Sequence, residues 1–188
     1  NAFLHIPRQA TQTYGNEVVE FSYNEMQAAV EKTRTAYIHA GYGEGHRIAL
    51  VLENRAEFFQ HFFALNGLGV CVVPVSAEFV VDEIAYLVDN SEVSIIISLP
   101  EHLAKVSEAL AKIQRKVDLC NIEDLGKISL APEVDSTNIR TGENADAAIL
   151  YTSGTTGKPK GCVLSNEFFF CVGDWYLNIG GYCAITPG

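Results

Sequence analysis

The feature that most constrains the fold is a series of short, uniformly apolar runs that alternate with amphipathic helical segments. The apolar runs are residues 47–52, 70–75, 94–98 and 117–122, and helices are expected at 55–66, at 81–90 and from Pro100 onward. Strands that lack polar alternation are typical of parallel sheets buried on both faces. Helices between such strands act as right-handed crossovers. The pattern therefore predicts an α/β fold, with a doubly wound, mainly parallel sheet flanked by helices.

The rest of the chain is organised around this series. Ser22 and Glu25 form a capping box that opens a helix reaching about Ala40, with Gly41 as its stop. We expect one partial domain over 1–188. Residues 20–122 are its layered βα core, 123–145 a surface connection with room for a short strand, and 146–188 a hairpin with a following helix. Asn166 is the expected N-cap of that helix, whose two apolar faces predict burial in a larger body.

A polar loop between two expected strands, 147–151 and 162–164, carries the clearest chemical signal. The string YTSGTTGKPKG, residues 151–161, combines hydroxyl donors, glycines that allow close backbone approach, and two lysines. This composition suits phosphate oxygens. The candidate binding residues are Thr152, Ser153, Gly154, Thr155, Thr156, Gly157, Lys158 and Lys160.

The alternative interpretation of this loop is an ordinary solvated turn between two strands. Its density of donors and lysines makes the turn the weaker interpretation. The spacing is not that of the common P-loop, because two residues rather than four separate Gly154 and Gly157. The dinucleotide-binding pattern GxGxxG and the hydrolase pattern GxSxG are also absent from the sequence near it.

Composition narrows the class of partner. A net charge of −10 disfavours nucleic acid, although a local basic site still suits a nucleotide. No apolar stretch approaches the ~18 residues of a membrane-spanning helix, and no signal-peptide pattern opens the chain. The five cysteines match no zinc pattern, and we interpret all of them as structural thiols in a reducing compartment. These features predict a cytoplasmic protein.

The other titratable residues give weaker signals. The five histidines have no Cys, Asp or Glu at a metal-ligand spacing, so surface or packing roles are the default. Glu53 and Glu57 could share a helix face, as could Asp82 and Tyr86. We interpret both pairs as ordinary solvated helix features.

The loop string resembles the phosphate-binding signature of the AMP-binding, adenylate-forming superfamily. Residues 45–58, 67–75 and 82–91 are similar to that family's first core strand and helix, its second strand and its next helix. The similarity covers roughly residues 20–165. Within the family, the chain resembles acyl-CoA ligases, including those similar to carnitine/crotonobetaine-CoA ligase.

This resemblance implies an activity and its small molecules. Family members activate a carboxylic acid with ATP, release pyrophosphate, and commonly pass the acyl group from acyl-AMP to coenzyme A. The loop would hold the β and γ phosphates of ATP, and Thr155 would meet the accompanying Mg²⁺. The resemblance therefore implies an ATP-dependent, AMP-forming acyl-CoA ligase with a small carboxylic acid, ATP and coenzyme A as its partners.

Much of the family's machinery has no counterpart in these 188 residues, including the C-terminal domain with its catalytic lysine. We therefore expect an N-terminal part of the large domain, inactive alone but active in an intact parent. Two alternatives stay open at this point. One is a non-catalytic short form that binds a nucleotide or a partner, and the other is an adenylate-forming enzyme that does not use coenzyme A.

Overall fold

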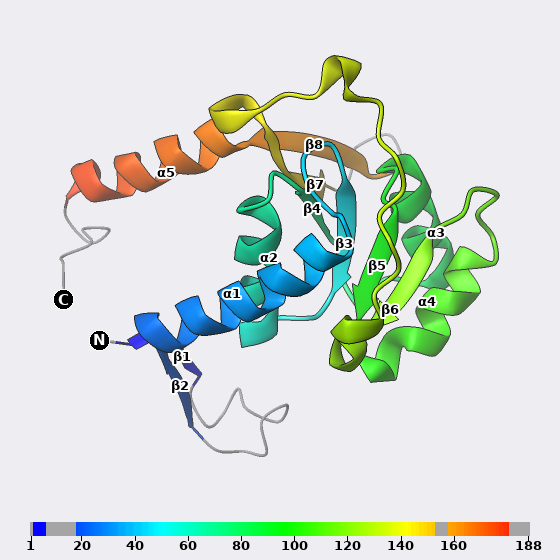
Figure 1. Ribbon diagram of the computed structural model, residues 1–188, viewed down its shortest axis with the longest axis horizontal. Coiled ribbons are helices and arrows are strands. Elements are labelled where there is room, and N and C mark those ends of the chain that lie inside the picture. The colour runs from blue at the N-terminus through cyan, green and yellow to red at the C-terminus, as the bar shows by residue number, and fades with distance from the viewer. Residues whose placement is uncertain (1, 7–17, 153–157, 181–188) are drawn as a thin grey trace.

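A computed structural model of the protein describes residues 2–6, 18–152 and 158–180. Its core has three layers, with a central sheet between two pairs of helices (Figure 1). The sheet is mainly parallel, and helices cover both of its faces. The predicted α/β fold class is therefore confirmed.

The bounds of the elements follow the sequence pattern closely. The strands are β1 (Ala2–Ile6), β2 (Val19–Ser22), β3 (Arg47–Val51), β4 (Cys71–Pro74), β5 (Ile95–Ser98), β6 (Asp118–Asn121), β7 (Asp146–Thr152) and β8 (Lys160–Ser165). The α-helices are α1 (Tyr23–His39), α2 (Ala56–Asn66), α3 (Val81–Asn90), α4 (Leu103–Leu110) and α5 (Asn166–Ile179). The short 3-10 helices are η3 (Pro100–His102), η4 (Ile122–Lys127), η5 (Ser136–Asn138) and η6 (Gly142–Asn144).

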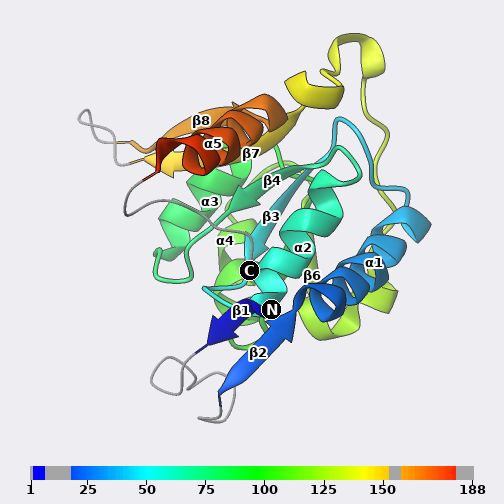
Figure 2. The same cartoon turned by 90° about the vertical axis from the view of Figure 1, so that its left-hand side faces the viewer.

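The strands of the central sheet lie in the order β6-β5-β3-β4-β7-β8. The first five are parallel to one another, and β8 pairs antiparallel with β7. β1 and β2 form a separate antiparallel hairpin, which the sequence pattern did not predict. The hairpin packs beside α1 at the end of the molecule where the N-terminus lies (Figures 1 and 2).

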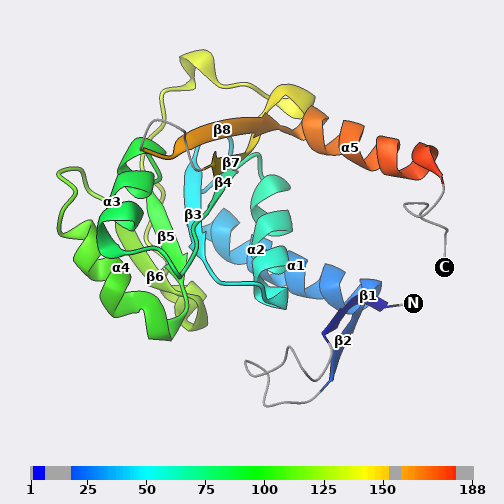
Figure 3. The same ribbon diagram turned by 180° about the vertical axis from the view of Figure 1, so that it is seen from behind.

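Alternate residues of β3 enter two separate cores. Ile48 and Leu50 pack in the core under α1 and α2, whereas Ala49 and Val51 pack in the core under α3 and α4. All four side chains are at most 1% exposed. Figure 3 shows the two helix pairs on opposite sides of the sheet. A strand buried on both faces has no polar side, which explains why its sequence is uniformly apolar.

Helix α1 begins as its sequence predicts. The Ser22 hydroxyl accepts a hydrogen bond from the Glu25 backbone N–H at 3.2 Å, and the Glu25 carboxylate accepts one from the Ser22 N–H at 2.8 Å. These two bonds satisfy backbone donors that a helix start otherwise leaves unpaired. The helix ends before Gly41, whose φ of 83° lies in the left-handed region that favours glycine.

Three local expectations were wrong. The connection 123–145 contains 3-10 helices and no strand, because its turn residues close short i,i+3 turns of their own. Ser165 rather than Asn166 caps α5, since the Ser165 hydroxyl accepts from the Phe168 N–H at 3.3 Å. Glu53 and Glu57 share no helix face, because α2 begins only at Ala56.

Helix α5 extends away from the layered core (Figures 1 and 3). None of its described side chains is buried, and its exposed aromatic residues include Phe170 and Trp175. In the part of the chain that is described, both apolar faces seen in the sequence are therefore largely uncovered, although the Phe169 ring lies 6.0 Å from that of Phe62 on α2. None of the described helices combines the length and apolar character that a membrane crossing requires.

Helices α1 and α2 are joined by a buried polar pair. The Tyr37 hydroxyl and His61 Nδ1 share a hydrogen bond of 2.6 Å, and both side chains are at most 2% exposed. Burial lowers the pKa of His61 to about 4 and raises the pKa of Tyr37 well above its usual value. Both groups are therefore neutral in the folded protein near pH 7.

This pair predicts a loss of stability in mild acid. The folded pKa of His61 lies below its unfolded value of about 6.5, so the unfolded chain binds the proton first as the pH falls. The free energy of unfolding should fall by about 3 kcal/mol between pH 6.5 and pH 4. Urea unfolding at a series of pH values measures it, with His61→Gln expected to flatten the slope. A matched change at the exposed His39, His39→Gln, should leave the slope as it is, and an unchanged slope in His61→Gln would contradict the assignment.

Candidate functional site

The ends of the candidate phosphate loop are held by the β7–β8 hairpin. Thr152 is the last residue of β7 and lies opposite Lys160, the first residue of β8. Both are exposed, as is Lys158. Ser153, Gly154, Thr155, Thr156 and Gly157 lie outside the described residues. The hairpin thus brings one hydroxyl and two ammonium groups to the mouth of one loop.

Strand β7 carries this loop at the carboxyl end of the parallel sheet. Its pairing with β4 is short, with Val72 opposite Ala148. Asn66, at the end of α2, reinforces it by donating from Nδ2 to the Val70 carbonyl at 3.1 Å and to the Ala147 carbonyl at 2.9 Å. One amide thereby ties a helix end to β7 and to the residue that precedes β4, which helps to hold β7 in the sheet.

An open hollow of about 490 Å³ lies at the carboxyl ends of β3, β4 and β7. Its walls are mostly apolar, with Leu50, Phe58, Pro74, Val75, Phe79 and Leu150. Glu53, Asn54, Ser76, Tyr151 and Thr152 add polar groups. Thr152 belongs both to this lining and to the mouth of the loop. A ligand in the hollow would therefore lie next to the Thr152 hydroxyl, on the strand position that pairs with Lys160.

The topology of the sheet explains why the hollow lies there. The connection from β3 to β4 passes through α2 on one face, and the connection from β4 to β5 passes through α3 on the other. The chain order therefore reverses between β3 and β4. Open α/β sheets bind ligands outside the carboxyl ends of the strands at such a reversal. The hollow occupies that position.

Two polar groups of the lining have fixed roles. Glu53 follows β3 with a φ of 57°, a left-handed conformation that turns the chain away from the sheet. Its carboxylate accepts a hydrogen bond from His102 Nε2 at 2.6 Å. Burial raises the pKa of Tyr151, so its phenol stays protonated and donates to Asn90 Oδ1 at 2.7 Å. Both the Glu53 carboxylate and the Tyr151 hydroxyl are therefore already hydrogen-bonded to other residues of the protein.

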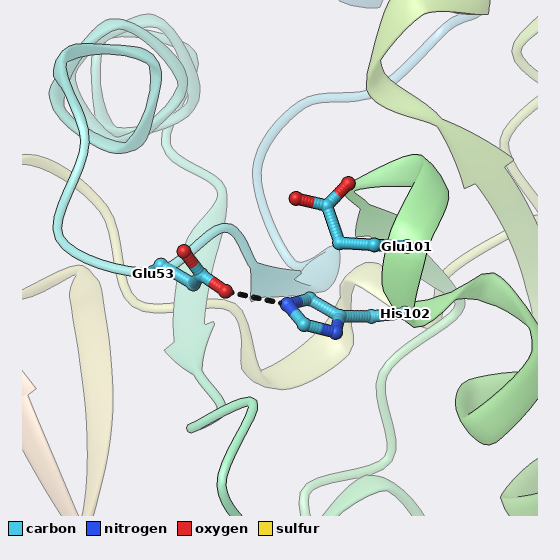
Figure 4. Close-up of side chains that lie close together, drawn as sticks. All are labelled: Glu53, Glu101 and His102. Carbon is cyan, nitrogen blue, oxygen red and sulfur yellow. Dashed lines mark hydrogen bonds and ion pairs between the residues drawn. The ribbon is translucent and has the colours of Figure 1, made fainter. Parts of the chain in front are cut away.

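One trio of possible metal ligands occurs among the described residues, namely Glu53, Glu101 and His102 (Figure 4). No sequence pattern indicates this trio, because Glu53 follows β3 and the other two residues follow β5. The pair Glu53–His102 accounts for one contact, and Arg55 Nη1 lies 3.9 Å from Glu101 Oε1. An arginine already balances the second carboxylate, so we interpret the trio as an ion-pair network.

The cysteines only partly fit the expected packing role. Cys71 and Cys120 are buried, whereas Cys162 and Cys171 are exposed, and Cys183 lies outside the described residues. The expectation was wrong for the two exposed thiols, because the β8 face and α5 that carry them are uncovered. Burial raises the pKa of Cys71 to about 12, so this thiol is protonated and a poor nucleophile at pH 7.

Sequence reasoning missed two residues that touch the loop ends, both on α3. The Tyr86 hydroxyl donates to the Pro159 carbonyl at 3.0 Å, and its ring lies 5.2 Å from Lys158 Nζ. Asn90 accepts from Tyr151, as described above. The interpretation of Tyr86 as a solvated helix residue was therefore wrong. The i,i+4 spacing of 86 and 90 was the available signal, but nothing in the sequence identified what that helix face contacts.

A family model described as AMP-binding enzyme matches residues 6–175 of the chain. The chain belongs to the AMP-binding enzyme family. This match covers most of the chain and includes both strands of the hairpin. The resemblance drawn from the loop string is thereby confirmed at the level of the family.

Curated relatives in this family include crotonobetaine/carnitine–CoA ligases. That of Salmonella heidelberg (strain SL476) is 28% identical over 169 residues, which cover 79% of this chain and 31% of the relative. That of Proteus sp. (strain LE138) is 26% identical over 179 residues, which cover 88% of this chain and 33% of the relative. The chain thus spans about a third of the length of these relatives.

Solved structures of similar fold include a CoA synthetase and an ATP-bound protein. The o-succinylbenzoate CoA synthetase of Bacillus subtilis, in complex with its acyl-adenylate intermediate, has a TM-score of 0.66 and 26% identity. The match covers 87% of this chain and 41% of that one. ATP-bound MatB from Rhodopseudomonas palustris has a TM-score of 0.64 and 26% identity, over 85% of this chain and 32% of that one.

Gly161, in strand β8 of the β7–β8 hairpin, leads to a prediction about stability. A Cβ at Gly161 would lie 2.9 Å from Ile149 Cγ2 and 3.1 Å from Tyr151 Cζ, so neighbouring side chains would have to shift. Gly161→Ala should lower the free energy of unfolding by about 1–3 kcal/mol. Gly173, inside α5, has open space around it, and Gly173→Ala should raise stability by about 0.5–1 kcal/mol. Thermal unfolding of both variants measures this, and a Gly161→Ala variant as stable as the parent would contradict it.

Proposed function

We propose that these residues belong to an ATP-dependent, AMP-forming acyl-CoA ligase. The observation that carries the proposal is the position of Thr152, which lines the hollow at the carboxyl ends of β3, β4 and β7 and lies opposite Lys160 across the mouth of the loop. Family membership supports it, as do two similar structures that hold ATP and an acyl-adenylate.

The reaction would begin with attack of a substrate carboxylate on the α-phosphorus of ATP. The bond from that phosphorus to the β-phosphate oxygen breaks, and pyrophosphate leaves with the electron pair. Negative charge grows on the leaving group, so donors and cations aimed at it lower the barrier. Lys158 and Lys160 supply two such charges. The chain's own contribution is thus to bind and neutralise the phosphates that leave.

The remaining loop residues extend this role. Ser153, Gly154, Thr155, Thr156 and Gly157 are proposed as further phosphate donors from the sequence alone. Mg²⁺ would accompany the ATP phosphates, with Thr155 as its proposed protein ligand. The apolar walls of the hollow, from Leu50 to Leu150, suit the non-reacting part of an organic acid.

The finer proposals concern the acceptor and the compartment. Coenzyme A is the proposed acceptor, because the curated relatives are named as CoA ligases. The thiolate of coenzyme A would attack the acyl carbonyl and displace AMP. The cytoplasm is the proposed compartment, since Cys71, Cys120, Cys162 and Cys171 are all free thiols.

The phosphate role is tested by replacing both lysines. Lys158→Ala combined with Lys160→Ala should slow pyrophosphate release by roughly 10²-fold, the scale seen when a charge-stabilising group is lost. The assay uses the protein in its longest natural form, with ATP and a panel of carboxylic acids. Lys116→Ala, which removes an exposed lysine with 86% of its side chain accessible, is the matched control. Undiminished release from the double variant would exclude the proposed site.

The acceptor is tested separately by product analysis. With ATP, an accepted acid and coenzyme A, mass spectrometry should detect acyl-CoA and AMP in equal amounts. Without coenzyme A, hydroxylamine should trap the acyl group from acyl-AMP instead. Trapping with hydroxylamine but no acyl-CoA at any coenzyme A concentration would favour an adenylate-forming enzyme with another acceptor.

A further inference from the structure

We propose that α3 positions the phosphate loop, and that Tyr86 and Asn90 are the positioning residues that hold its two ends. The inference rests on the proposed function of the loop. It concerns the residues that come directly before and directly after the segment 153–157, and those flanking residues are described. Neither α3 residue needs to touch a substrate for this role.

The exit end of the loop is held by Tyr86. Its hydroxyl donates to the Pro159 carbonyl at 3.0 Å, and its ring lies 5.2 Å from Lys158 Nζ. Pro159 has a fixed φ, so restraining its carbonyl also restrains the residues on either side. The cation–π contact further limits the rotamers of a long, flexible lysine. Tyr86 therefore acts on both the backbone and the charge at this end.

The entry end is held by Asn90. The Tyr151 hydroxyl donates to Asn90 Oδ1 at 2.7 Å, and the Leu87 carbonyl lies 3.4 Å from the same hydroxyl. Tyr151 immediately precedes Thr152. A side-chain bond one residue before the loop sets the direction in which the chain enters it.

The two contacts match the geometry of a helix face set against a hairpin. Residues four apart on a helix have Cβ atoms about 5–6 Å apart. Neighbouring antiparallel strands are about 4.7–4.9 Å apart. Tyr86 and Asn90 can therefore each meet one strand of the hairpin, Asn90 on β7 and Tyr86 at the start of β8. One turn of α3 spans the mouth of the loop.

Helix α3 is itself rigidly seated. Ile84 and Val88 are 0% exposed and pack into the core against the sheet, and Leu87 is also 0% exposed. Lys105, on α4, donates to the Ala77 carbonyl at 2.6 Å and so holds the segment that leads into α3. A lysine held in place by a fixed helix has less conformational freedom to lose when it meets a phosphate. The contacts of Tyr86 and Asn90 should therefore strengthen the binding of ATP and leave the binding of the carboxylic acid unchanged.

The test is a KM comparison in the protein's longest natural form. Tyr86→Phe keeps the ring and removes the bond to Pro159, and should raise the KM for ATP about 3- to 10-fold. Tyr86→Leu also removes the ring under Lys158 and should raise it about 2- to 5-fold further. The KM for the carboxylic acid should stay unchanged in Tyr86→Phe, as should the thermal midpoint.

The entry end has its own matched pair. Asn90→Leu removes the acceptor for the Tyr151 hydroxyl and should raise the KM for ATP. Asn90→Asp keeps an acceptor at this position and should show the KM for ATP of the parent protein. Tyr23→Phe, at a tyrosine of α1 that is 63% exposed, is the control for the loss of a hydroxyl and should behave as the parent.

Two results would overturn the inference. One is an unchanged KM for ATP in both Tyr86 variants. The other is an equal rise of both KM values with a lowered thermal midpoint, which is the result expected of a purely structural residue. The variant with both Lys158→Ala and Lys160→Ala distinguishes a failure of the positioning role from a failure of the proposed function. If that variant loses pyrophosphate release while the Tyr86 variants match the parent, only the positioning role is wrong. If it retains release, the phosphate site itself is wrong.

Discussion

Burial of both faces of the central strands is the constraint on which the site depends. Ile48 and Leu50 fill one core, while Ala49 and Val51 fill the other, so β3 cannot shift without opening both. Full burial of a large aliphatic side chain contributes about 1.5–3 kcal/mol, which makes such a shift costly. This rigidity ends near the carboxyl end of β7, where Leu150 is 40% exposed. The loop therefore begins at the boundary between a fixed sheet and solvent.

That boundary explains why the polar side chains of the hollow lie at one end of an otherwise apolar sheet. Strand interiors have no room for donors, because helices cover both faces. The first positions free of this constraint lie at the end of each strand or just after it, and there the chain places Glu53, Ser76 and Thr152. Their strands are neighbours, although the residues are far apart in sequence. The reversal of chain order between β3 and β4 keeps this end open as a hollow.

The sequence predicted what depends on local pattern and missed what depends on packing between distant elements. Apolar runs identified β3 to β6, and the capping box identified the start of α1, because burial and capping leave direct signatures in residue type. The family resemblance was recognised from the loop's own string, and the phosphate-binding role of that loop stays a prediction. The contact of Tyr86 with Pro159 spans 73 positions, and no local pattern encodes it. The Glu53–His102 pair was missed for the same reason, since strand order brings those residues together.

The loop string itself contains glycines with two different physical roles. The proposed role of Gly154 and Gly157 is to let the backbone approach a ligand. Gly161 has a described role in packing, because its missing Cβ leaves room for the Tyr151 ring to lie across β8. Only with the ring in that place does its hydroxyl reach Asn90 on α3. A side chain at 161 would therefore disturb the loop through Tyr151, which precedes it, rather than through the residues proposed to bind phosphate. The motif thus combines residues proposed to contact a ligand with a glycine whose described role is to make room for a neighbouring side chain.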